Sequence, residues 1–232
     1  MHFTDTHLVP PGLMLWGLDP RRRLEACIAD VNAHHRDAEI CVVTGDLVHK
    51  GEPAAYAELR ACLDGLALPY RLLAGNHDVR EALTDAFPEI ERDADGFLQS
   101  VVDTSAGRLI LCDTQEAGRA WGTYCDRRLR WLDDRLREAQ GMPVMLFMHH
   151  PPFDIAIPCL DHIGQRDAAA LAEVIRPARH IRHMFFGHVH RLVSGSWLGI
   201  PFSALRGTNH QVPFDLVTTN PVPKDQSRPY YA

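Results

Sequence analysis

The chain has 232 residues, of which 46% are hydrophobic and 23% charged, and its formal net charge at pH 7 is −6. These fractions are typical of a globular protein, with enough length for one α/β domain or two smaller ones. The negative charge excludes the basic surface that grips long nucleic acids, and no apolar run is long enough to span a membrane. The six cysteines are scattered without a CxxC pair and no signal peptide opens the chain, so we expect a cytoplasmic protein.

The first half of the chain alternates short apolar runs with amphipathic stretches, which predicts strands followed by helices. In order, we expect a strand at 1–4, a helix at 21–32, a strand at 40–43, a helix at 54–63, a strand at 70–73 and a short helix at 81–87. At the start of the first helix Asp19 precedes Pro20, and an N-cap aspartate followed by proline is a frequent helix beginning.

The second half continues the alternation. The expected elements are strands at 98–102 and 109–112 joined by a turn, a helix at 126–140, a strand at 144–148, a helix at 167–176, a strand at 183–186, and a hairpin of 192–197 with 200–204. Residues 153–164 show no clean periodicity and are interpreted as a cap loop, and residues 207–232 as an extended C-terminal arm. The pattern favours a single α/β domain at 1–206, built on one mixed sheet or on two sheets packed as a sandwich.

Side chains that commonly bind metal ions follow five of these apolar runs. They are Asp5 and His7, then Asp46, then Asn76 with His77 and Asp78, then His149, and finally His188 with His190. In open α/β sheets ligands bind at the carboxyl ends of the strands, so we expect these side chains to converge. Carboxylate and imidazole ligands of this kind hold two metal ions roughly 3.5–4 Å apart in hydrolytic sites, and Asp46 is the natural bridge between them.

The five pieces, in this order, resemble the motifs of the calcineurin-like metallophosphoesterases: DxH, GD, GNHD, a later His, and GHxH. The resemblance implies the family fold, a four-layer αββα sandwich of two mixed β-sheets flanked by helices. Three further segments, at 51–56, 148–152 and 207–213, are similar to the bacterial cyclic-nucleotide phosphodiesterases and glycerophosphodiesterases. Any one motif is weak evidence, whereas five in family order are specific.

The resemblance also implies a role for each residue. The first metal would be held by Asp5, His7, Asp46 and His190, and the second by Asp46, Asn76, His149 and His188. His77 would contact the phosphate, together with Asn76, and protonate the leaving oxygen, while Asp78 would orient His77 through a hydrogen bond. His210 is added as a substrate contact. A hydroxide bridging two ions of iron, manganese, zinc or cobalt would attack the phosphate in line.

The residues leave alternative functions open. The leading hypothesis is hydrolysis of a small phosphodiester, either a 3′,5′-cyclic nucleotide such as cAMP or a glycerophosphodiester. On the same site, the alternatives are a phosphomonoesterase, a 2′,3′-cyclic nucleotide phosphodiesterase or a nuclease, and least of all an inactive scaffold. No cluster of Arg or Lys follows GNHD, which favours a diester, and the negative charge argues against a nuclease. We expect a homo-oligomer with no membrane partner and no polymeric nucleic acid partner.

Two further sets of residues have more than one interpretation. His150 adjoins His149, but Pro151 and Pro152 follow it and indicate a rigid turn, so it is not counted among the ligands. Trp16, Trp121 and the loop after Pro152 either line a substrate pocket or pack internally.

Overall fold

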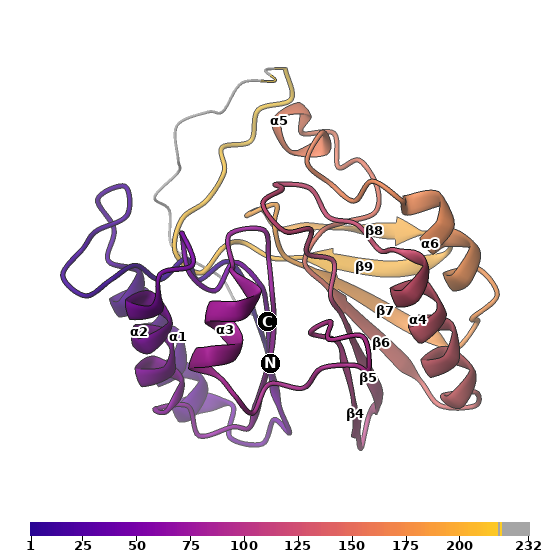
Figure 1. The fold of residues 1–232 in the computed structure, drawn as a ribbon, viewed down its shortest axis with the longest axis horizontal. Helices are drawn as coiled ribbons and strands as arrows, with labels where there is room; N and C mark the ends of the chain where they lie inside the picture. The colour runs from indigo at the N-terminus through magenta and orange to yellow at the C-terminus, as the bar shows by residue number, and fades with distance from the viewer. Residues whose placement is uncertain (218, 220–232) are drawn as a thin grey trace.

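Two β-sheets lie face to face with helices on both outer sides, in a computed structural model that describes residues 1–217 and 219 (Figure 1). The first sheet has the order β1 (His2–Phe3), β2 (Cys41–Thr44) and β3 (Tyr70–Leu73). Its outer side carries α1 (Pro20–His34), α2 (Pro53–Leu63) and α3 (Arg80–Ala86). The expected αββα sandwich is therefore confirmed.

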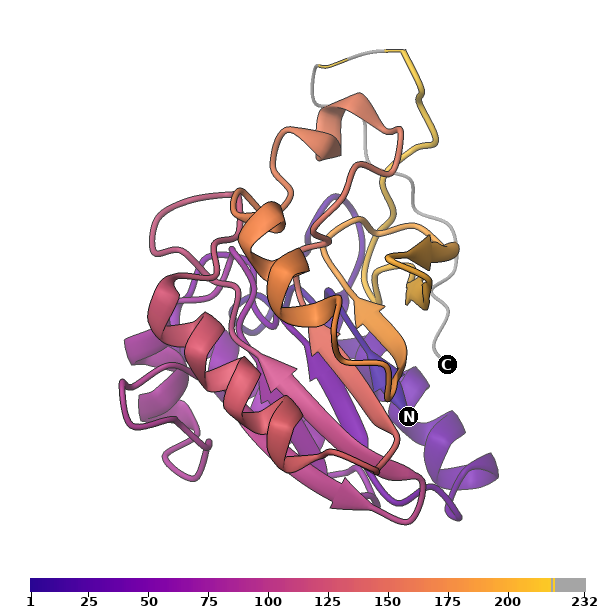
Figure 2. The same cartoon turned by 90° about the vertical axis from the view of Figure 1, so that its right-hand side faces the viewer.

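The second sheet has the order β4-β5-β6-β7-β9-β8. Its strands are β4 (Ser100–Thr104), β5 (Gly107–Cys112), β6 (Val144–Met148), β7 (Ile181–Phe186), β8 (Val193–Trp197) and β9 (Ile200–Ala204). Helices α4 (Asp126–Glu138) and α6 (Ala168–Ile175) lie across its outer face (Figure 2).

One detail of the expected fold is corrected by the strand pairing. The second sheet is mixed, because β4 and β8 pair antiparallel with their neighbours, whereas the first sheet is parallel throughout. The reason is local: each pair of consecutive strands in the first sheet is joined through a helix, and such a crossover makes the strands parallel. All three carboxyl ends consequently meet at one edge.

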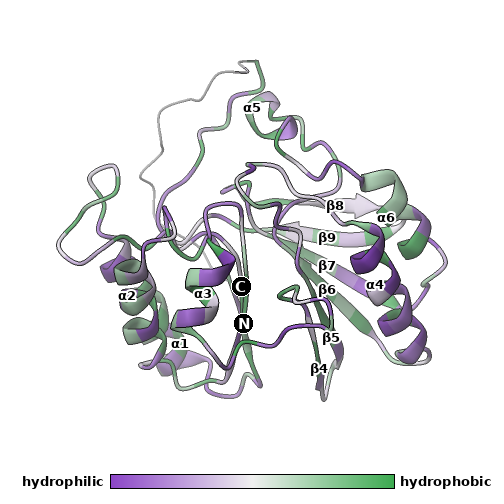
Figure 3. Ribbon diagram, viewed as in Figure 1, coloured by the Kyte–Doolittle hydropathy of each residue, from purple (hydrophilic) through white to green (hydrophobic). Residues whose placement is uncertain are grey.

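Three groups of buried apolar side chains hold the layers together. One lies between the first sheet and its helices, and another between the second sheet and its helices. The third fills the space between the sheets and consists of Val42, Leu73, Leu109, Leu111 and Phe147. Helix α4 illustrates the division, because Leu132 and Leu136 are buried while its outer surface is charged and mostly purple in Figure 3.

The helix beginnings follow the sequence signals closely. At α1 the Arg22 amide donates to the Asp19 carboxylate at 3.2 Å, and Pro20 opens the helix as expected. Helix α4 begins at Asp126, one residue earlier than it would if Asp126 were the N-cap, because Cys125 is the N-cap. Asp167 is the N-cap of α6, but its carboxylate accepts a hydrogen bond from the Tyr124 amide instead of from its own helix.

The two segments without a clear sequence pattern are more ordered than expected. Residues 153–164 contain a short helix, α5 (Pro158–Asp161), at the end of the molecule toward which β6 runs. Residues 207–212 are buried, and the amides of Thr208 and Asn209 donate to the carbonyls of Thr4 and Asp5 at 2.9 and 3.3 Å. The start of the predicted arm is thus packed beside β1, while 218 and 220–232 lie outside the described residues. No helix among the described residues has the length and apolar character needed to cross a bilayer.

Candidate metal centre

The loops that leave the strands carry the candidate ligands in an uncommon backbone conformation. Among residues 1–217 and 219, eight non-glycine residues have positive φ, and five of them are candidate ligands: Asp5 (54°), His7 (45°), Asp46 (49°), His188 (69°) and His190 (49°). This left-handed region costs about 1–2 kcal/mol for a residue with a Cβ atom. Its concentration here indicates a functional constraint, because such strain gathers at functional sites.

The first group of candidate ligands consists of Asp5, His7, Asp46 and His190, all buried, with one ligand atom from each lying within 4.8 Å of the others. His190 Nε2 is 3.2 Å from Asp5 Oδ1, and it is also 3.2 Å from His7 Nε2. His7 Nε2 in turn is 3.5 Å from Asp46 Oδ2. Two carboxylates and two imidazoles therefore aim their ligand atoms at one small volume.

The second group shares Asp46 with the first. His149 Nε2 lies 3.3 Å from Asp46 Oδ1 and 3.3 Å from Asn76 Oδ1, and His188 Nδ1 lies 2.9 Å from the same Asn76 oxygen. Asp46 thus presents Oδ2 to the first group and Oδ1 to the second, which is the geometry of a bridging carboxylate. All seven ligands predicted from the sequence are brought together.

Backbone carbonyls fix how two of the histidines face the centre. His149 Nδ1 donates to the Thr44 carbonyl at 2.6 Å, and His190 Nδ1 donates to the His210 carbonyl at 2.9 Å. A carbonyl only accepts hydrogen bonds, so each ring keeps its proton on Nδ1 and turns Nε2 toward the ligand cluster. A partner of this kind on the outer nitrogen is typical of metal-binding histidines.

The electrostatics of the cluster favour the protonation states that metals require. Burial lowers the pKa of His188 to about 3 and holds that of His7 well below its usual value, so both rings are neutral at pH 7. Burial would raise the pKa of Asp46, but the neighbouring imidazoles, His149 first, lower it well below its ordinary range. Burial alone would lower the pKa of His149, but the carboxylates of Asp46 and Asp5 and the hydrogen bond to the Thr44 carbonyl together raise it to about 9. A cation that bound here would displace that proton.

The predicted hydrogen bond between Asp78 and His77 is wrong. His77 Nδ1 donates to the His49 carbonyl at 2.8 Å, and its amide donates to Asp46 Oδ1 at 2.9 Å. The ring is about one-third exposed, with Nε2 4.0 Å from Asp46 Oδ2. His77 is therefore beside the ligand cluster, held by a main-chain carbonyl that side-chain motifs do not reveal.

Asp78 instead joins the loops that follow β2 and β3. Its carboxylate accepts from the amides of Leu47, Val48 and Gly75 at 3.1, 3.2 and 2.8 Å, and from the Tyr56 hydroxyl at 3.1 Å. Burial and the nearby Asp46 raise the pKa of Asp78 to about 6. Since Asp46 and Asn76 directly adjoin the bound amides, Asp78 positions two candidate ligands through the backbone.

Sequence reasoning missed His49 and did not foresee where His150 packs. His49 lies three residues after Asp46, with Nδ1 3.4 Å from His7 Nδ1 and its ring stacked on His77 at 5.0 Å. The spacing from Asp46 was the only signal for it. His150 is fully buried, 4.6 Å from the His188 ring, and its Nδ1 is 2.8 Å from Thr114 Oγ1. It forms part of the wall of the centre as well as the turn.

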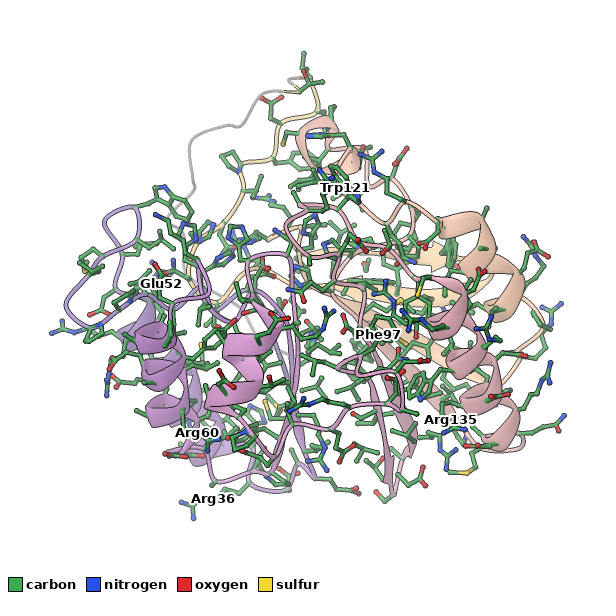
Figure 4. All side chains as sticks on the ribbon, viewed as in Figure 1. Arg36, Glu52, Arg60, Phe97, Trp121 and Arg135 are labelled. Carbon is green, nitrogen blue, oxygen red and sulfur yellow. The ribbon has the colours of Figure 1, made fainter. Side chains whose placement is uncertain are left out.

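The remaining candidates surround the centre at different depths. His210 is buried, with its ring 4.8 Å from that of His7, so it lies adjacent to the first ligand group, and its contact with the substrate stays a prediction. Trp16 contacts His210 at a ring separation of 4.3 Å. Trp121, by contrast, packs against the guanidinium groups of Arg119 and Arg166 near the segment that carries α5 (Figure 4).

The sequence is similar to a known protein family and to several curated proteins. A family profile described as "Calcineurin-like phosphoesterase" matches residues 1–192, which include every candidate ligand. The chain belongs to this family. A curated relative from Rhodopseudomonas palustris, described as a "probable cyclic nucleotide phosphodiesterase", is 44% identical over 99% of this chain and 85% of its own length. A "glycerophosphodiester phosphodiesterase" of Enterobacter lignolyticus is 29% identical over 99% of this chain and 81% of its own.

Among solved structures, a dimetal phosphatase from Danio rerio has a TM-score of 0.70 at 15% sequence identity. The match covers 89% of this chain and 86% of the zebrafish chain. At that identity the likeness shows the fold alone, in agreement with the two-sheet sandwich of this chain.

Proposed function

We propose that this member of the calcineurin-like phosphoesterase family is a dinuclear-metal phosphodiesterase that hydrolyses a small phosphodiester. The observation that carries the proposal is Asp46, whose two oxygens face two separate groups of buried ligand atoms. The names of the two curated relatives, one a cyclic nucleotide phosphodiesterase and the other a glycerophosphodiesterase, support a diester as the substrate.

The donor atoms fit metal ions in both groups. Asp5, His7, Asp46 and His190 would hold the first ion, and Asp46, Asn76, His149 and His188 the second. Buried carboxylates, imidazoles and an amide oxygen suit iron, manganese, zinc or cobalt. When bound there, two such ions supply Lewis acidity to the phosphate and lower the pKa of a water so that it attacks near neutral pH.

We infer that His77 acts as a proton donor. Its Nδ1 proton is engaged by the His49 carbonyl, so a second proton on Nε2 makes the ring an imidazolium. In that state Nε2–H can stabilise charge on the phosphate and then pass its proton to the leaving alkoxide. The stacked ring of His49 limits how far His77 can turn.

The first experiment is hydrolysis by purified, manganese-loaded protein. The substrates are bis(p-nitrophenyl) phosphate, 3′,5′-cyclic AMP, 2′,3′-cyclic AMP, glycerophosphoethanolamine and p-nitrophenyl phosphate. We expect at least one diester to be hydrolysed faster than the monoester. Preference for p-nitrophenyl phosphate would make the protein a phosphomonoesterase on the same site, and intact diesters throughout would refute catalysis.

Metal analysis tests the bridge independently of turnover. We expect Asp46→Ala to lose both ions and Asn76→Ala to lose one, while Asp64→Ala, an exposed aspartate at the end of α2, keeps both. Equal metal content in Asp46→Ala and the parent would contradict the bridging role. The same samples give the identity of the metals, and light scattering tests the proposed homo-oligomer. Fractionation of source cells tests the proposed cytoplasmic location.

A further inference from the structure

A hairpin next to the metal centre places a tryptophan where the backbone disfavours it. Leu15 and Leu18 exchange two hydrogen bonds, of 2.8 and 3.0 Å, in the indigo loop that precedes α1 in Figure 1. Between them Trp16 and Gly17 have φ angles of 50° and 78°. Positive φ at both central residues is the pattern of a type I′ turn, which prefers asparagine, aspartate or glycine. The turn explains Gly17 but not Trp16.

The contacts of the Trp16 side chain explain why a tryptophan occupies this turn position. Its ring contacts those of His210 and His49 at 4.3 and 5.1 Å, with interplanar angles of 64° and 80°. These two contacts fix the indole in place, yet 40% of the residue remains exposed. A bulky residue held in a strained conformation with part of its surface open points to a role in binding.

The rings beside Trp16 connect it to the candidate ligands. His210 lies 4.8 Å from His7 and 4.3 Å from His190, measured between ring centroids. On the other side His49 lies 5.5 Å from His7, again measured between ring centroids. One histidine ring therefore separates the indole from the ligand cluster on each side. A phosphate bound at the metals would leave the group that it carries beside Trp16.

We infer that Trp16 stacks on the base of a nucleotide, so that the substrate class is a cyclic nucleotide and not a glycerophosphodiester. The inference rests on the proposed function and names the substrate of that same site. Every nucleobase has a flat π-face that stacks on an aromatic side chain, whereas glycerol and ethanolamine have none. Trp16 is thus a specificity-determining residue of the site.

The test uses two variants that separate the ring from the turn. Trp16→Asn removes the indole but suits a type I′ turn, so we expect its thermal stability to match or exceed that of the parent. Trp16→Phe keeps an aromatic face. With manganese-loaded protein, we expect Trp16→Asn to raise KM for 3′,5′-cyclic AMP roughly 5- to 100-fold, with kcat/KM for glycerophosphoethanolamine unchanged and Trp16→Phe close to the parent.

Binding gives a readout that does not depend on turnover. We expect calorimetry to find weaker binding of 5′-AMP to Trp16→Asn than to the parent, with no change for ribose 5-phosphate, which lacks the base. Equal losses toward both diesters, or no loss toward either, would overturn the inference. So would a selective loss toward glycerophosphocholine, which would assign the indole to a cationic head group. If the parent hydrolysed no diester, the proposed function would fail. The difference between the binding of 5′-AMP and of ribose 5-phosphate would still test whether Trp16 stacks on a base.

Discussion

Asp78 gives the sharpest test of how the centre is built, because its substitution separates a catalytic carboxylate from a structural one. Asp78→Ala would leave three buried amides, those of Leu47, Val48 and Gly75, without an acceptor. An unsatisfied buried donor costs about 1–3 kcal/mol, so three cost roughly 6 kcal/mol together. Against this, the variant removes a buried charge whose pKa is raised from 3.8 to about 6. That relief is worth about 3 kcal/mol above pH 6.

The balance predicts a net loss of about 3 kcal/mol of unfolding free energy for Asp78→Ala. In Asp78→Asn the amide oxygen still accepts from two donors, so one or two partners are lost and the charge is relieved as well. We therefore expect Asp78→Asn to lie within about 1–2 kcal/mol of the parent. Urea unfolding followed by circular dichroism, at pH 7.5 and with matched metal content, measures both values.

The sign of the pH dependence follows from the raised pKa. Between pH 4 and 6 the folded protein binds more protons at Asp78 than the unfolded chain does. Its contribution is therefore complete below about pH 4 and is lost as the pH rises through 6, a slope that Asp78→Asn lacks. Equal destabilisation by Ala and Asn would refute the acceptor argument. An Asp78→Asn enzyme that kept its metals but lost all activity would restore a catalytic role for the carboxylate.

Three further predictions concern other parts of the structure. His77→Asn should lower kcat about 10²- to 10⁴-fold at unchanged metal content, because we expect the ring to donate a proton and to bind no metal. Loss of metal from this variant, measured by atomic absorption, would contradict the role of proton donor. Gly187→Ala should lose metal and about 1–3 kcal/mol of stability, because the added Cβ would lie 3.0 Å from His149 Nδ1 and closer still to Thr4 Oγ1. The control in the same thermal unfolding experiments is Gly164→Ala, whose added Cβ would have its nearest contact, the Pro151 carbonyl oxygen, at 3.3 Å. His2 is buried and its pKa is lowered to about 3, so on acidification the unfolded chain binds a proton at this residue before the folded protein does. The free energy of unfolding should therefore fall by about 1.4 kcal/mol per pH unit as the pH drops below 6.5. The same dependence of stability on pH in His2→Phe as in the parent would contradict this expectation.

The sequence was most informative where residue type and position coincide. The candidate ligands follow apolar runs directly, and the carboxyl ends of the strands then bring Asp46, Asn76 and His149 together. Strand and helix positions were predicted to within a few residues, because the alternation of apolar runs and amphipathic stretches is regular. The cap role of 153–164 and the boundary at 206 stay predictions.

The interactions that the sequence did not reveal involve the main chain. The partner of His77 is a carbonyl, and three of the four partners of Asp78 are amides, which every residue carries. A pattern of side chains contains no information about which of these groups a loop will expose. For the same reason His49 escaped notice, since its importance depends on the path of the loop after Asp46.

The left-handed backbone at five candidate ligands has a consequence for how such a protein changes over generations. Each of these residues occupies a conformation that glycine, and to a lesser extent asparagine, would adopt at lower cost. A descendant released from the need for hydrolysis would therefore gain stability by the very substitutions that destroy the centre. Durability and chemistry oppose each other at the same few positions, so selecting this protein for heat resistance alone would tend to erode its metal binding.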